Sequence, residues 1–86
     1  MTELRKTVTR VQTGVRIEKR ILKTLKIIAA HKEMSLGDLL EGIVLHAFEG
    51  KQPFSDETLK LIAEAKKSAG LDLTAHDSHL LDEAAP

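Results

Sequence analysis

The sequence contains no cysteine, no tryptophan and no tyrosine, and its aromatic residues amount to two phenylalanines. A chain without cysteine forms no disulfide and no thiolate metal site, which is typical of proteins in a reducing compartment. No apolar run approaches the roughly 18–20 residues of a membrane-spanning helix, and the start "MTELRKTVTR" lacks the apolar stretch of a signal peptide. We therefore expect a soluble, cytoplasmic protein.

The sequence also lacks the usual signatures of an enzyme. It has no glycine-rich phosphate loop, no cysteine nucleophile, and no grouping of serine, histidine and acid beyond chance. The stretch "HDSH" places His76 and His79 three residues apart around Asp77, without the further ligands that a metal site needs. We predict a protein that is not an enzyme and that holds no metal or cofactor.

Charge is balanced over the chain but divided between its two parts. Residues 1–32 carry nine Lys and Arg against two acids, whereas residues 33–86 carry four against eleven, giving a net +7 and −7. A basic part without aromatic rings suits phosphate better than stacked single-stranded bases. A second interpretation is that the two parts attract each other, within or between chains.

A period of two runs through residues 9–17, "TRVQTGVRI". The odd positions are all β-branched, and the even positions are polar or glycine: Arg10, Gln12, Gly14 and Arg16. Such alternation predicts a β-strand with one apolar face and one polar face.

The remaining sequence has the periodicity of helices. Apolar residues at helical spacing predict a helix from about residue 18 to 32, and a second from about 36 to 49 begins at the N-cap Ser35 and stops at Gly50. Ser55 and Gly70 bracket a third helix. Its apolar stripe is modest, so we expect this helix to add little to the core. The acidic tail from residue 71 forms a short capped helix or stays mobile.

A lone strand leaves its amides and carbonyls unpaired, and no other strand is predicted after residue 18. We therefore expect a homodimer in which two copies of the strand pair as an antiparallel ribbon. The expected fold class is mainly α with one N-terminal β-strand and an additional C-terminal helix. The expected parts are an N-terminal extension (1–8), a dimerisation and DNA-binding domain (9–50) and a C-terminal helix with an acidic tail (51–86).

Strand, helix and capped helix within about 45 residues resemble the ribbon-helix-helix (MetJ/Arc) family of DNA-binding regulators. The resemblance covers roughly residues 9–49, including "VRIEKRILKTLKIIAAHKEMSLGDLLEGIV". It implies that the ribbon enters the major groove of double-stranded DNA, where Arg suits guanine and Gln suits adenine. The implied base-reading residues are Gln12, Gly14 and Arg16, to which the polar face of the strand adds Arg10.

Phosphate contacts are expected at two helix starts. The resemblance places a phosphate-binding backbone at Ser35, Leu36 and Gly37, and Lys19 and Arg20 add positive charge at the start of the preceding helix. The expected function is that of a dimeric, sequence-specific transcriptional regulator. One form of this hypothesis is an autoregulatory, antitoxin-like protein, in which residues 55–86 bind a protein partner. The alternative is a dimeric protein-interaction module that does not bind DNA, favoured by Gly14 and by the neutral net charge.

Overall fold

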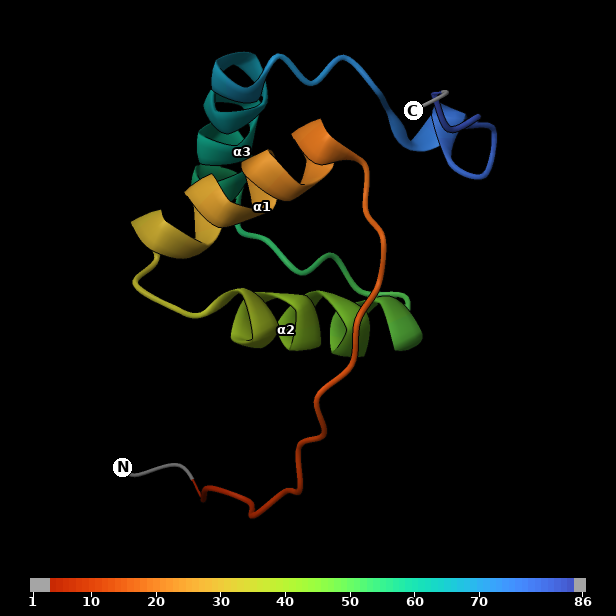
Figure 1. Cartoon of the computed structure of the whole chain (residues 1–86). Helices are drawn as coiled ribbons and strands as arrows, with labels where there is room; N and C mark the ends of the chain where they lie inside the picture. Colours follow the sequence, from red (N-terminus) through yellow and green to blue (C-terminus); the bar gives the residue numbers. More distant parts are fainter. Residues whose placement is uncertain (1–3, 85–86) are drawn as a thin grey trace.

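The computed structural model describes residues 4–84 and consists of three α-helices and a short 3-10 helix (Figure 1). The helices are α1 (Lys19–His31), α2 (Leu36–Phe48) and α3 (Asp56–Ala69), and η1 (Ala75–Asp77) lies in the C-terminal segment. α1 packs extensively on α3 and less extensively on α2. No helix within residues 4–84 is long and apolar enough to pass through a bilayer.

The helices begin and end close to the predicted residues, so the three helix predictions are confirmed. The Ser35 side chain accepts a hydrogen bond from the Asp38 amide (3.1 Å), and the Ser55 side chain accepts one from the Thr58 amide (3.2 Å). These bonds satisfy amides that have no partner inside the helix. Gly50 and Gly70 follow α2 and α3 with φ values of 67° and 69°, which glycine adopts without a steric penalty.

The turn between α1 and α2 is tight and has the left-handed residue of a common helix ending. Glu33 has a φ of 55°, and the next amide, that of Met34, donates to the carbonyl of Ala29 (3.0 Å). Glycine is the usual residue at this position because an L side chain is strained there. Glu33 therefore stabilises the turn less than glycine would.

The core is small and is shared by all three helices. Its buried apolar residues are Ile28 and Ala29 of α1, Leu39 of α2 and Ala65 of α3. Thr58 of α3 is also buried, at 7% exposure. The expectation that the third helix adds little to the core is therefore wrong. Its buried residues Thr58 and Ala65 are small, and the larger Ile62 packs against the same core.

The predicted β-strand is absent, and the predicted fold class is wrong in this respect. Residues 4–17 run as a stretched-out segment past α2 without regular secondary structure, and residues 4–84 contain no strand and no sheet (Figure 1). The predicted intermolecular ribbon is overturned with the strand. Alternating β-branched residues favour an extended backbone, but a strand also needs a hydrogen-bonded neighbour.

Candidate nucleic-acid interface

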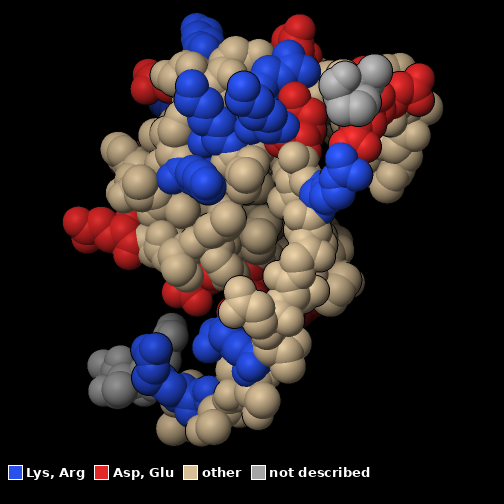
Figure 2. All heavy atoms as spheres, in the orientation of Figure 1, with Lys and Arg blue, Asp and Glu red and all other residues tan. Residues whose placement is uncertain are grey.

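Positive charge covers the N-terminal segment and the outer side of α1. Figure 2 shows Lys and Arg side chains gathered over α1 and again along the N-terminal segment. The exposed members of this set are Arg5, Lys6, Arg10, Arg16, Lys19, Lys23 and Lys26. We call residues 4–17 the arm, and we call Lys19, Lys23 and Lys26 the lysine face of α1.

Arg10 of the arm is held by acids of α2. Its Nε and one terminal nitrogen each donate to a carboxylate oxygen of Glu41 at 2.9 Å, and Asp38 lies 3.9 Å away. The hydrogen bonds from Arg10 lower the pKa of Glu41, and the same hydrogen bonds raise the pKa of Arg10. This two-point contact fixes the guanidinium beside α2 and ties the arm to the helix.

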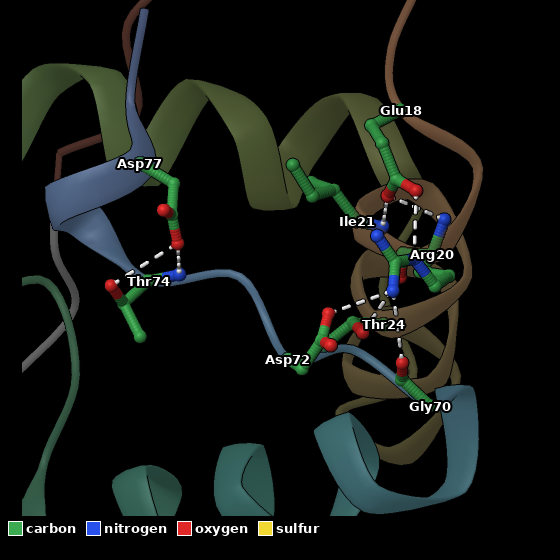
Figure 3. Close-up of polar contacts among 8 residues, drawn as sticks. All are labelled: Glu18, Arg20, Ile21, Thr24, Gly70, Asp72, Thr74 and Asp77. Atoms are coloured by element: carbon green, nitrogen blue, oxygen red, sulfur yellow. Dashed lines mark hydrogen bonds and ion pairs between the residues drawn. The ribbon is translucent and has the colours of Figure 1, made fainter. Parts of the chain in front are cut away.

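Arg20 stands at the centre of a second cluster, at the start of α1 (Figure 3). Its Nε donates to Glu18 (2.8 Å), and another of its nitrogens donates to Asp72 (2.8 Å) and to the carbonyl of Gly70 (3.4 Å). Glu18 also caps α1, accepting from the amides of Arg20 (2.7 Å) and Ile21 (2.9 Å). The Arg20 side chain, followed by the Ile21 amide, lowers the pKa of Glu18. The negative charge of Glu18 is therefore partly neutralised at the cap.

Arg16 reaches the end of the described chain. It is paired with Glu83, although both side chains are largely exposed. The C-terminal segment has some local order before this point: the Thr74 amide donates to the Asp77 carboxylate (2.8 Å) at η1. As a result, each arginine among the predicted DNA-contacting residues forms an ion pair with a carboxylate from another part of the chain.

The arm and the start of α2 form the two walls of a groove of about 700 Å³. The groove is lined by members of both predicted sets, Arg10, Gln12, Gly14, Leu36 and Gly37, together with apolar residues. The structure thus brings much of the predicted base-reading set beside the predicted phosphate-binding backbone of α2. Four other predicted residues do not line this groove: Arg16, Lys19, Arg20 and Ser35.

The lysine face of α1 differs from the arginines. Within residues 4–84, no carboxylate lies within salt-bridge distance of Lys19, Lys23 or Lys26. All three side chains are exposed on one helix. Their charge is therefore available to an anionic partner without the loss of an internal ion pair.

α2 has a largely uncovered apolar stripe. Leu36 and Leu40 are half-buried, while Val44 is 42% exposed and Phe48 is 80% exposed. These residues follow one another at a spacing of four, so they lie on one face of the helix. The buried residue Leu39 points instead to the shared core. We call Leu36, Leu40, Val44 and Phe48 the α2 stripe.

Sequence reasoning missed the acidic half of these contacts. Glu18 had no signal as a cap, since glutamate is not among the favoured N-cap residues. Glu41, Asp72 and Glu83 are separated by 31 to 67 residues from their arginines, so no local pattern connects them. The opposite charges of the two halves of the chain were the available signal.

Comparison with known proteins adds no family to this description: no protein-family model, no curated protein and no solved structure matches the chain.

Proposed function

We propose that this protein binds double-stranded DNA as a homodimer in the cytoplasm and regulates transcription. The observation that carries the proposal is the lysine face of α1, which presents three cations that have no carboxylate partner within residues 4–84. Lysines that neutralise phosphates release condensed counterions, and this supplies affinity for DNA of any sequence. The resemblance to ribbon-helix-helix regulators stays a prediction, and the proposal does not use a ribbon.

Sequence preference would come from the arm. Arg10, Gln12 and Arg16 are exposed and carry the side-chain types that pair with guanine and adenine edges. An extended N-terminal segment that enters a groove beside a DNA-bound helix is a known arrangement. Gly14 contributes no side chain, so base reading would rest on its neighbours.

The homodimer now depends on the α2 stripe, because the unpaired strand no longer supports it. The described structure exposes 7855 Å² for a 9.5 kDa chain, whereas a compact monomer of that mass exposes about 5,000 Å². Part of this excess belongs to the arm. The extended C-terminal segment holds another part, so the case for a dimer rests on the exposed Val44 and Phe48 of the stripe. A second copy packed on the stripe would also double the number of lysine faces in the particle that binds DNA.

A gel-shift experiment with genomic fragments tests the proposal. The variant Lys23→Gln/Lys26→Gln should bind all fragments more weakly, while the matched control Lys60→Gln/Lys67→Gln on α3 should bind like the unchanged protein. Arg16→Ala should weaken binding to the preferred fragment and reduce the preference for it. Binding that is the same in all these variants would contradict the proposal.

The ion pairs favour a second candidate, a dimeric protein-interaction module. Arg10, Arg16 and Arg20 are each engaged by carboxylates of the same chain. If they are structural, the acidic segment 71–84 and the exposed Leu80 (70%) would serve a protein partner instead of DNA. Absence of a shift with every fragment at low salt would favour this candidate.

A further inference from the structure

We infer that the C-terminal segment of this chain, residues 70–84, screens its own DNA-binding surface by occupying Arg16 and Arg20 with carboxylates. This inference rests on the proposed function, since it concerns the regulation of the same surface.

The C-terminal segment contacts both Arg16 and Arg20 directly. Arg20 donates to Asp72 at 2.8 Å and to the carbonyl of Gly70 at 3.4 Å, and Arg16 is paired with Glu83. An arginine that contacts DNA would present the same nitrogens to phosphate oxygens or to a base edge. The carboxylates therefore occupy donors that DNA would use.

The C-terminal segment is purely acidic in its charged residues. Residues 71–84 contain four acids and no Lys or Arg, and two of these acids make the contacts with Arg16 and Arg20. A third, Asp77, caps η1 and is half-buried, so it orders the segment between the two contacts (Figure 3). The chain thus contains two anchored contacts with an ordered turn between them.

The ion pairs between the C-terminal segment and the two arginines are exposed to solvent and therefore weak. The side chains of Arg16, Asp72 and Glu83 are exposed by 83%, 82% and 68%. Ion pairs at such exposure are screened by water and salt, and each changes an equilibrium by roughly fivefold or less. DNA, with its high density of phosphates, is able to displace them. The segment would therefore reduce DNA affinity without abolishing it.

The test compares two full-length variants with the same change in net charge. Asp72→Asn/Glu83→Gln removes the screening carboxylates, and Glu57→Gln/Glu64→Gln removes two carboxylates from the surface of α3. Binding to a fluorescein-labelled duplex is followed by anisotropy. We expect the first variant to bind roughly three- to tenfold more tightly than the unchanged protein, and the second to change by less than about twofold. Equal tightening in both would assign the effect to net charge and would overturn the inference.

A readout without DNA separates this inference from the proposed function. Arginine modification by phenylglyoxal, followed by peptide mass spectrometry, should be faster at Arg16 and Arg20 in Asp72→Asn/Glu83→Gln, and unchanged at Arg5. Unchanged rates with DNA binding intact would overturn the inference alone. Faster modification with no DNA binding by any variant would overturn the proposed function and the screening role together.

Discussion

At the scale of single residues, two glutamates occupy positions where other residues are usual. Glu18 caps α1, and Glu33 takes the left-handed position after it. Glutamate is not among the favoured N-cap residues, and glycine is the usual residue at the left-handed position. Glu18 accepts hydrogen bonds from two amides of α1, whereas the φ of Glu33 is unfavourable for an L side chain.

Replacing Glu33 with glycine should stabilise the fold. Its φ of 55° is unfavourable for an L side chain, and the relief should exceed the entropy that glycine adds to the unfolded chain. We expect a gain of about 0.5–1 kcal/mol in the free energy of unfolding, measured in urea. Glu49→Gly is the control, since Glu49 has a φ of −98° and should lose stability. A loss in both variants would contradict this account of the turn.

The charge of Glu18 should make stability depend on pH. Its pKa lies below the ordinary value of 4.5 in the folded chain, chiefly because of the hydrogen bond from Arg20. The ionised form therefore stabilises the fold above that value, and the contribution is lost as the pH falls through the lowered pKa. Glu18→Gln should melt at a lower temperature than the unchanged protein at pH 7, and the difference should disappear in acid. Circular dichroism measures both; a difference that does not vary with pH would refute the assignment.

At the scale of elements, the sequence predicted the helices better than their packing. Helical spacing and the caps Ser35 and Ser55 placed all three helices, because these signals are local. The strand prediction failed because pairing depends on a neighbour that the alternation in residues 9–17 does not specify. The role of α3 was underestimated because Ala65 contributes little to a hydrophobic stripe but is 2% exposed in the structure.

Removing α3 should therefore destabilise the whole fold. A chain that ends after Gly50 loses Ala65 and Thr58 from the core and uncovers one side of α1. We expect it to lose cooperative thermal unfolding, measured by circular dichroism. A chain that ends after Gly70 keeps all three helices and is the control, which should still unfold cooperatively. A cooperative transition in the shorter chain would show that α3 is dispensable.

At the scale of the whole molecule, the chain is more open than a monomer of its length. Its radius of gyration is 14.7 Å, compared with about 12 Å for a compact domain of 86 residues. The arm and the C-terminal segment, which both lie outside the three-helix core, contribute to this value (Figure 1). The net charges of +7 and −7 suggested that the two parts of the chain attract each other. The ion pairs of Arg10, Arg16 and Arg20 with acids of residues 33–86 are contacts of this kind.

A charge placed on the α2 stripe should separate the copies of the chain. Phe48→Glu should sediment as a monomer at low micromolar concentration, where the unchanged protein should show about twice the chain mass, because an unpaired carboxylate is costly to bury. Leu59→Glu on α3 is the matched control and should remain dimeric, since Leu59 lies outside the stripe. A monomeric unchanged protein would contradict the dimer.

The salt dependence of DNA binding tests the central claim most directly. The full-length protein is titrated into a random-sequence duplex at several salt concentrations, and the logarithm of the binding constant is plotted against the logarithm of salt concentration. If two lysine faces contact phosphates, six lysines should give a linear plot with a slope of about −5. No binding at low salt, or binding that does not respond to salt, would contradict the account.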